Sequence, residues 1–231
     1  GAEMIKYASN AFLATKISYI NELANLCEKA EVDIKDVSFG MGLDERIGER
    51  FLRAGPAYGG SCFPKDTRAL IDTANKFNID LSIVKNVVKS NENRKLLLTR
   101  KIVTILNKKL RNKTITFLGV TFKPNTDDMR EASSIPMINF LSKKNCKIRY
   151  FDPSGEKKEL NKIKNVQFYK NISSACLKSD LIIIHTEWNV FKLLDFKKLV
   201  KKKNFSIYDM RNIYSPSKMR QMKIKYYGVG R

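Results

Sequence analysis

The segment GGSCFPKD, residues 59–66, places a thiol, a cation and a carboxylate close together. A cysteine reacts as its thiolate, and a neighbouring cation such as Lys65 favours that form. Two glycines ahead of Cys62 let backbone N–H groups approach a bound substrate. Asp66 lies four residues after Cys62 and can hold a water molecule or orient a partner. This grouping is typical of covalent catalysis by Cys62, whereas a loop around an inert buried cysteine is the alternative.

A second candidate pair, Lys6 and Asn10, lies four residues apart near the start of the chain. Apolar residues recur there at threes and fours, which predicts an amphipathic helix over residues 2–30. At this spacing both side chains project from one helix face, towards one ligand. The alternative is that they belong to the polar stripe of the helix and have no further role.

The rest of the first ninety residues also shows a helical pattern. We expect a short helix over residues 32–41, a glycine- and proline-rich loop over 53–63 and a helix over 67–78. Residues 82–110 contain no helix breaker, which predicts one long helix or two nearly continuous ones.

The second half of the chain alternates short β-branched runs with helical segments. The pattern predicts strands at 114–118, 147–151, 181–184 and 205–208, and helices near 135–142, 172–177 and 195–201. Alternating strands and helices indicate a parallel sheet covered on both faces, so the fold class is α plus α/β. Ligands of such sheets bind at the carboxyl ends of the strands. Lys123 and Arg211 stand at two of those ends, where they suit a phosphate group or are solvated turn residues.

The net charge of +21 is confined to one part of the chain. Residues 1–90 contain 12 basic and 12 acidic residues, whereas residues 91–231 contain 32 basic and 11 acidic ones. Such an asymmetry can indicate an anion-binding half. No helix-turn-helix, RNA-recognition or zinc-finger pattern accompanies the charge, so we expect no nucleic-acid partner.

Several classes of protein are disfavoured by what the sequence lacks. No apolar run is long enough to span a membrane, and the first residues do not resemble a signal peptide. Four cysteines are widely spaced and there is one histidine, which argues against a metal cluster. We therefore expect reduced thiols, a cytoplasmic location and no membrane partner. No G-x-G-x-x-G follows an expected strand, so the usual dinucleotide fingerprint is absent.

Several blocks, in this order, resemble the UDP-glucose/GDP-mannose dehydrogenase family. They are AEMIKYASNAFLATKISYINE, GLDERIG, FLRAGPAYGGSCFPKD, GVTFKPNTDDMREASS, FDP, TEWNVF and DMRN. The resemblance covers the family's central and carboxyl-terminal domains and leaves out its amino-terminal NAD-binding domain. It implies a helical dimerisation domain over 1–90, a connecting helix over 91–111 and a Rossmann-like UDP-sugar-binding domain over 112–231.

The resemblance also implies a reaction. The family oxidises C6 of a nucleotide sugar twice with NAD+, which for UDP-glucose gives UDP-glucuronate. Cys62 would form first a thiohemiacetal and then a thioester with the sugar. Lys6 and Asn10 would stabilise the developing oxyanion, a role worth about 3–4 kcal/mol in oxyanion holes. Asp66 would orient the hydrolytic water or the ammonium group of Lys6.

Substrate and cofactor contacts are implied in the same way. The loop that includes Phe51, Arg53, Tyr58 and Gly59 would surround the nucleotide sugar. Lys123 would grip the substrate and Arg211 would lie near its uridine diphosphate. Arg46 would reach the sugar nucleotide of a partner subunit, which implies a homodimer. Lys65 and Arg130 would touch NAD, held mainly by the missing domain.

Three alternatives stay open at the level of sequence. GDP-mannose or another nucleotide sugar could replace UDP-glucose as substrate, although GGSCFPKD favours UDP-glucose over UDP-N-acetyl sugars. The chain could be a binding module without catalysis. The basic excess could also belong to a nucleic-acid binder. Because the dinucleotide fingerprint is absent, we expect no turnover by the chain alone.

Overall fold

A computed structural model describes residues 1–231, which form two compact units. A helical unit contains Gly1–Lys95 together with Val229–Arg231, and an α/β unit contains Leu96–Gly228. The boundary between them falls inside helix α4 (Ser82–Ile105). The last three residues group with the helical unit, whereas the sequence placed them in the carboxyl-terminal domain. The two units are described separately below.

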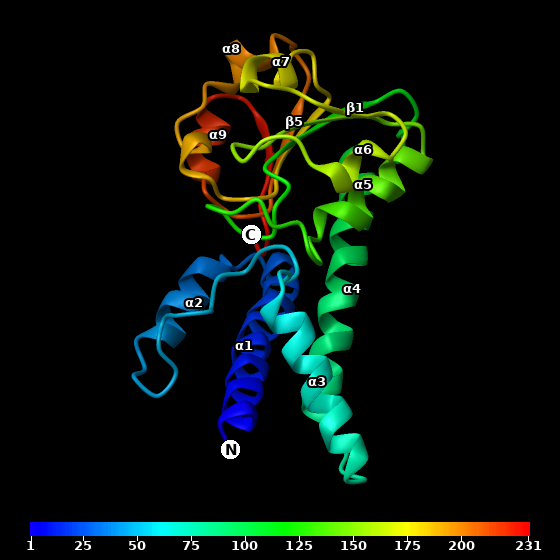
Figure 1. Cartoon of the computed structure of the whole chain (residues 1–231). Helices are drawn as coiled ribbons and strands as arrows, with labels where there is room; N and C mark the ends of the chain where they lie inside the picture. Colours follow the sequence, from blue (N-terminus) through cyan, green and yellow to red (C-terminus); the bar gives the residue numbers. More distant parts are fainter. The chain divides into compact units, whose positions relative to one another are not determined.

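The helical unit consists of α1 (Ala2–Ala30), α2 (Ile34–Gly42), α3 (Cys62–Lys76) and the first part of α4 (Figure 1). Helix α1 packs against both α2 and α3. The chain terminus also joins this unit, because the Ile34 amide donates to the Gly230 carbonyl oxygen at 2.9 Å. Gly230 has a φ of 69°, and a Cβ there would lie 2.8 Å from side-chain atoms of Ala24 and Ile34. Only glycine fits this close approach.

The predicted helices are confirmed, with shifted ends. Helix α3 starts at Cys62 and not at residue 67, and α4 ends at Ile105 and not at residue 110. Two left-handed residues, Asn107 and Lys108, follow α4 and end the helix. The start of α3 matters most, because it moves Cys62 from a loop to the first turn of a helix.

The α/β unit is built on one six-stranded parallel sheet with the order β3-β2-β1-β4-β5-β6. The strands are β1 (Thr114–Leu118), β2 (Lys147–Phe151), β3 (Val166–Phe168), β4 (Leu181–Ile184), β5 (Ser206–Asp209) and β6 (Lys225–Tyr227). This is the strand order of Rossmann-type sheets, so the predicted Rossmann-like fold is confirmed. The order reverses between β1 and β4, which makes their carboxyl ends the switch point of the sheet.

Short helices connect the strands. They are α5 (Ser134–Lys143), α6 (Lys158–Asn161), α7 (Ile172–Cys176), the 3-10 helix η1 (Asn189–Phe191), α8 (Phe196–Val200) and α9 (Pro216–Gln221). Every residue of β4 and of β5 is buried, so both faces of these central strands are covered. A cluster that includes Ile182, Ile184, Phe191 and Phe196 forms the core on β4.

Candidate active site

Cys62 is the first residue of α3, directly after the N-cap residue Ser61. Gly60 precedes them with a φ of 81°, a backbone conformation that allows the sharp entry into the helix. The amino end of a helix carries partial positive charge and favours an anion in its first turn. Cys62 therefore presents an exposed thiol at the amino end of α3.

The other three cysteines have a different environment. Cys27, Cys146 and Cys176 are all buried and make no disulfide. Burial raises the pKa of Cys146 to about 11 and that of Cys176 to about 12, so both stay protonated thiols at neutral pH. Cys62 is the exposed cysteine of the chain, which supports its selection as the nucleophile candidate.

Asp66 is fully buried one turn after Cys62. Asn10 of α1 donates from Nδ2 to Asp66 Oδ2 at 2.6 Å. The Lys65 ammonium lies 3.3 Å from Oδ1, the second carboxylate oxygen, which accepts no hydrogen bond. A buried carboxylate needs such an amide and a cation to offset its desolvation. The structure thus brings together three predicted site residues: Asn10, Lys65 and Asp66.

Lys6 lies one helical turn before Asn10 on α1 and is exposed. It makes no hydrogen bond or ion pair with Asp66, whose partners are Asn10 and Lys65. Its role at an oxyanion, and the convergence of its amine with the Cys62 sulfur, stay predictions.

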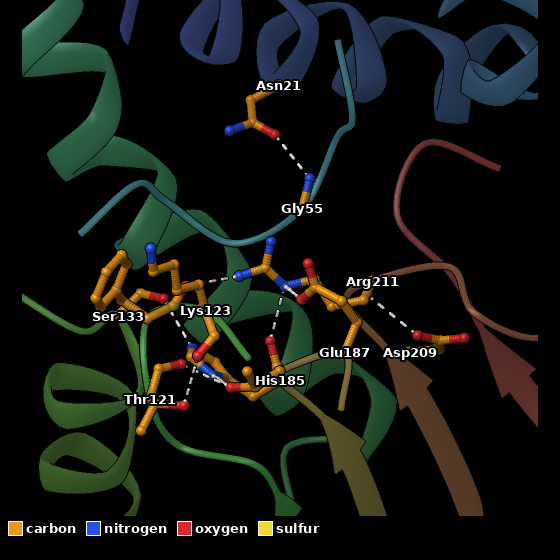
Figure 2. A network of polar contacts seen from close by, with 11 residues as sticks. Asn21, Gly55, Thr121, Lys123, Ser133, His185, Glu187, Asp209 and Arg211 are labelled. Atoms are coloured by element: carbon orange, nitrogen blue, oxygen red, sulfur yellow. Dashed lines mark hydrogen bonds and ion pairs between the residues drawn. The ribbon is translucent and has the colours of Figure 1, made fainter. Parts of the chain in front are cut away.

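The loop over residues 51–60 is held by buried polar side chains that the sequence analysis missed. Asn21 of α1 accepts from the Gly55 amide at 2.9 Å, as Figure 2 shows. Arg94 of α4 donates to the Gly55 carbonyl oxygen at 3.1 Å, and also to Asn21 O and Asn25 Oδ1. Asn91 accepts from the Tyr58 amide and donates to its carbonyl oxygen. The loop that leads to Cys62 therefore has a fixed backbone.

The predicted substrate residues of this loop occupy two environments. Tyr58 is buried in a small core with Ala14 and Val87, and its ring lies 5.9 Å from that of Phe63. Gly59 is also buried, whereas Phe51 and Arg53 are exposed. The side chains of Phe51 and Arg53 can therefore contact a ligand directly, whereas Tyr58 and Gly59 contribute to the shape of the loop through their backbone.

Arg46 lies apart from the cysteine, in the turn that follows α2. Its guanidinium pairs with Asp44 through both carboxylate oxygens at 2.6–3.2 Å, and this hydrogen bonding lowers the pKa of Asp44. The Arg46 side chain is 89% exposed. It is therefore accessible to a partner, as the predicted role in a second subunit requires.

In the α/β unit, Lys123 and Arg211 both follow carboxyl ends of strands, Lys123 after β1 and Arg211 after β5. Arg211 follows β5 and donates to the carbonyl oxygens of His185 at 2.9 Å and Phe122 at 3.1 Å, while its Nε lies 2.9 Å from Glu187 (Figure 2). Lys123 is exposed, and its ammonium lies 5.4 Å from the centre of the Phe122 ring. Arg211 thus ties the carboxyl ends of β1, β4 and β5 together and fixes the loop that carries Lys123.

Gly119 makes this convergence possible. It follows β1 with a φ of 76°, and a Cβ there would lie 2.6 Å from Thr186 Cβ after β4. The Thr186 hydroxyl donates to the Thr121 carbonyl oxygen at 2.6 Å. The two strand ends therefore approach as closely as a glycine allows.

Arg130 lies in the same unit beyond Lys123. It pairs with Asp128 at 2.8–3.2 Å and lowers the pKa of that carboxylate by hydrogen bonding. Its side chain is 68% exposed. The cation keeps solvent access, which a cofactor contact needs.

His185, the only histidine, is fully buried beneath this site. Its Nε2 lies 2.8 Å from Ser133 Oγ and its Nδ1 lies 3.1 Å from Thr186 Oγ1. Burial, with the nearby Arg211 guanidinium, lowers the pKa of His185 from 6.5 to about 3. The imidazole is therefore neutral at physiological pH, and its hydrogen bonds link Ser133 to Thr186 beside the strand ends.

This depressed pKa predicts a pH-dependent stability. Between pH 6.5 and 3 the unfolded chain binds a proton that the folded chain does not, so stability falls as the pH falls. From pH 7 to pH 5 the loss from His185 should be about 2 kcal/mol. Urea unfolding of the wild type and of His185→Gln at both pH values measures it. Equal losses in the two proteins would show that His185 does not titrate in this way.

The chain matches two models of one family. The central domain of the UDP-glucose/GDP-mannose dehydrogenase family matches residues 1–93, and the UDP binding domain of the same family matches residues 116–216. The chain belongs to the UDP-glucose/GDP-mannose dehydrogenase family. The resemblance noted in the sequence is thereby confirmed.

Individual dehydrogenases of this family are similar over the whole chain. UDP-glucose 6-dehydrogenase of Rickettsia typhi is 45% identical over an alignment of 233 positions that covers 99% of this chain and 54% of that protein. The enzyme of Rhizobium meliloti is 42% identical over 100% of this chain and 53% of its own length. The chain thus spans about half the length of the curated relatives it matches.

Solved dehydrogenase structures show the same fold. A UDP-glucose dehydrogenase from Pyrobaculum islandicum aligns with a TM-score of 0.85 at 33% identity, over 98% of this chain and 50% of that one. An NDP-N-acetyl-D-galactosaminuronic acid dehydrogenase from Methanosarcina mazei aligns with a TM-score of 0.88 at 26% identity, over 100% and 50%. These two similar dehydrogenases are named for different nucleotide sugars.

Proposed function

We propose that the chain is the nucleophile-bearing and sugar-nucleotide-binding half of an NAD-dependent UDP-glucose 6-dehydrogenase. The observation that carries this proposal is the exposed Cys62 thiol at the amino end of α3, one turn from the buried Asp66 carboxylate that accepts from Asn10. Similarity to UDP-glucose 6-dehydrogenases at 42–45% identity supports UDP-glucose as the substrate. In the complete enzyme we place this function in a cytoplasmic homodimer formed through the helical domain.

The covalent steps follow from thiol chemistry. The Cys62 sulfur adds its electron pair to the C6 aldehyde, and the carbonyl oxygen takes up a proton to give a thiohemiacetal. Loss of two electrons and two protons from that adduct gives a thioester. Water then attacks the acyl carbon, and the carboxylate leaves as the C–S bond breaks and the thiol is restored.

The side chains around Cys62 have distinct roles in this scheme. Lys6 and Asn10 stabilise the negative oxygen that develops at C6. Asp66 holds the Asn10 amide in place through the 2.6 Å hydrogen bond and orients the attacking water. The fixed backbone of residues 51–60 positions the sugar.

When bound by the complete enzyme, NAD+ would supply the two-electron oxidant for the two oxidations, from the C6 alcohol to the aldehyde and from the thiohemiacetal to the thioester. The residues of this chain can contribute only peripheral contacts to NAD+. Lys65 and Arg130 are exposed cations that suit the phosphates of the cofactor. No glycine-rich phosphate loop follows a strand here. We therefore propose that the rest of the enzyme holds NAD+ and that the isolated chain makes no product.

The α/β unit would bind the UDP moiety. Lys123 offers an exposed ammonium at the switch point, where ligands of such sheets bind. Arg211 acts mainly by fixing the Lys123 loop, since its guanidinium already contacts Phe122, His185 and Glu187. Arg46 remains the candidate contact from a partner subunit.

Two other functions compete with this one. The family name includes GDP-mannose, and the similar enzyme from Methanosarcina mazei is named for an N-acetylated sugar, so these are the alternative substrates. A sugar-nucleotide-binding module without catalysis would retain the switch-point site but would not need the thiol.

Thermal-shift titration of the chain with UDP-glucose, GDP-mannose and UDP-N-acetylglucosamine tests the substrate. A ligand at 100 times its Kd stabilises the folded state by about 2.7 kcal/mol, which raises Tm measurably. UDP-glucose should give the largest shift, and Lys123→Met should reduce it while Lys170→Met, at the end of β3, should not. Equal shifts with all three ligands would refute the assignment.

A further inference from the structure

Basic and acidic residues of the α/β unit are separated: the basic ones gather where the strands of the sheet start, and the acidic ones where the strands end. All neighbouring strands are parallel, and residues near their starts are in register across the sheet: Val166, Ile148, Ile115, Leu181, Ser206 and Lys225. The segments at these starts therefore lie along one edge. We name it the amino edge, and it comprises residues 107–113, 143–147, 162–165, 177–180, 201–205 and 222–225.

The amino edge carries fifteen basic residues and one acidic residue. The basic residues are Lys108, Lys109, Arg111, Lys113, Lys143, Lys144, Lys147, Lys162, Lys164, Lys178, Lys201, Lys202, Lys203, Lys223 and Lys225. The acidic one, Asp180, already pairs with Lys113 at 3.3 Å and Lys202 at 2.7 Å. The other thirteen are exposed and make no ion pair. This edge accounts for most of the net charge of +21.

The opposite edge has the reverse balance. The segments at the carboxyl ends of the strands, residues 119–131, 152–156, 169–171, 185–187 and 209–212, hold seven acidic and four basic residues. A general lysine bias of the sequence would populate both edges alike. Since it does not, the basic edge is a feature of this fold's surface.

Helix dipoles account for only part of the basic edge. Cations are favoured at the carboxyl end of a helix, and of the fifteen residues Lys143 lies in a last turn while Lys144, Lys162 and Lys201 are C-cap residues. Like charges at this density repel one another and oppose folding. An external polyanion would remove that repulsion.

The chemistry of the edge favours a membrane over a nucleic acid. Fourteen of the fifteen residues are lysine, whereas phosphate-specific contacts in nucleic-acid recognition favour the arginine fork. Phe140, 38% exposed, stands beside the edge, and the Lys144 ammonium lies 5.7 Å from its ring centre. The row of stacking aromatics that single strands require is missing.

One hollow on this edge is wide enough for a charged headgroup. It measures about 690 Å³ and is lined by Val103, Lys108, Lys109, Leu110, Arg111, Phe140 and Lys144, with no acidic side chain. An anionic lipid phosphate fits such a lining of three lysines and an arginine.

We propose that the amino edge of the sheet docks the protein onto the surface of an anionic lipid bilayer. The binding is electrostatic and reversible and requires no transmembrane segment. No helix of the chain has the length and apolar character to cross a bilayer. The expectation of no membrane partner came from the same lack of an apolar span, which a charged surface does not need.

Vesicle sedimentation with two charge-matched variants tests the proposal. The edge variant carries Lys109→Gln, Lys144→Gln, Lys164→Gln, Lys203→Gln and Lys223→Gln; the control carries Lys29→Gln, Lys76→Gln, Lys89→Gln, Lys170→Gln and Lys192→Gln. All ten lysines are exposed, and both variants lose five charges. The probes are vesicles of phosphatidylcholine alone and with 30% phosphatidylserine, at about 0.1 M salt.

Wild type and control should sediment with the anionic vesicles and not with the neutral ones. The edge variant should partition at least about 100-fold more weakly. Equal partitioning of both variants would show that net charge alone acts, and would overturn the proposal. So would absence of wild-type binding, or a preference for a single-stranded RNA over the vesicles.

A footprint on the wild type keeps the test valid if the edge variant fails to fold. Anionic vesicles should protect Lys109, Lys144 and Lys203 from acetylation and leave Lys76 and Lys89 reactive. Uniform protection, or none, would contradict the proposed surface.

Discussion

Replacing Cys62 with serine in the enzyme completed with its dinucleotide-binding domain should reduce NADH formation from UDP-glucose by at least about 10³-fold. A hydroxyl is a far weaker nucleophile than a thiolate and cannot form the thioester. The exposed position of Cys62 means that the substitution leaves the packing intact. Steady-state absorbance at the NADH band measures the loss.

Two measurements separate chemistry from folding in this experiment. The thermal shift of Cys62→Ser with UDP-glucose should match that of the wild type, because sugar-nucleotide binding does not need the thiol. Cys146→Ser, at a buried cysteine, is a control for the loss of any thiol and should retain the wild-type rate once folded. A Cys62→Ser enzyme with wild-type turnover would remove the cysteine from the mechanism.

Arg94→Met should destabilise the helical unit by about 3 kcal/mol. The buried guanidinium donates to the carbonyl oxygens of Gly55 and Asn21 and to Asn25 Oδ1, at 2.6–3.1 Å. Methionine fills similar space but leaves those buried acceptors without their donor, which costs their desolvation energy. Urea unfolding of the chain gives the free-energy change.

Arg100→Met is the matched control for this effect. Arg100 lies on the same helix, α4, and is exposed. Its replacement should change the unfolding free energy by less than about 0.5 kcal/mol. Similar effects of both substitutions would mean that the loop does not depend on Arg94.

Hydrophobic periodicity was sufficient to predict the long helices and the central strands. β4 reads Leu-Ile-Ile-Ile and is buried throughout, so its pattern is unambiguous. The strands β3 and β6 have three residues each and lie at the two edges of the sheet, where burial no longer imposes a pattern. Their sequences, Val-Gln-Phe and Lys-Tyr-Tyr, were therefore missed.

The candidate site was predictable in its residue types but not in its contacts. The spacing of Cys62 and Asp66 was visible, yet the helix start was placed five residues late because glycines and a proline suggested a loop. Ser61 as a cap and Pro64 in a first turn, where proline is tolerated, were the signals that could have corrected it. The pairing of Asn10 with Asp66 joins residues 56 apart and requires the packing of α1 on α3.

The buried Asn21, Asn91 and Arg94 were missed for a related reason. On a helix, a polar residue among apolar ones reads as a surface position unless its partner is known. Here the partners are backbone groups of Gly55 and Tyr58, in a loop distant in sequence. The basic edge was missed for the same kind of reason. Its lysines are scattered along the sequence and come together only because six parallel strands start at the same end of the sheet.

The central claim is that the sugar becomes bonded to the sulfur of Cys62. Acid quenching of the completed enzyme during turnover of UDP-glucose, followed by peptide mass mapping, tests it most directly. We expect a UDP-glucuronyl adduct on the peptide that contains Cys62, and none on those with Cys27, Cys146 or Cys176. An adduct on another residue would contradict covalent catalysis by Cys62. So would product formation without any modification of Cys62, both under these conditions and in single turnovers.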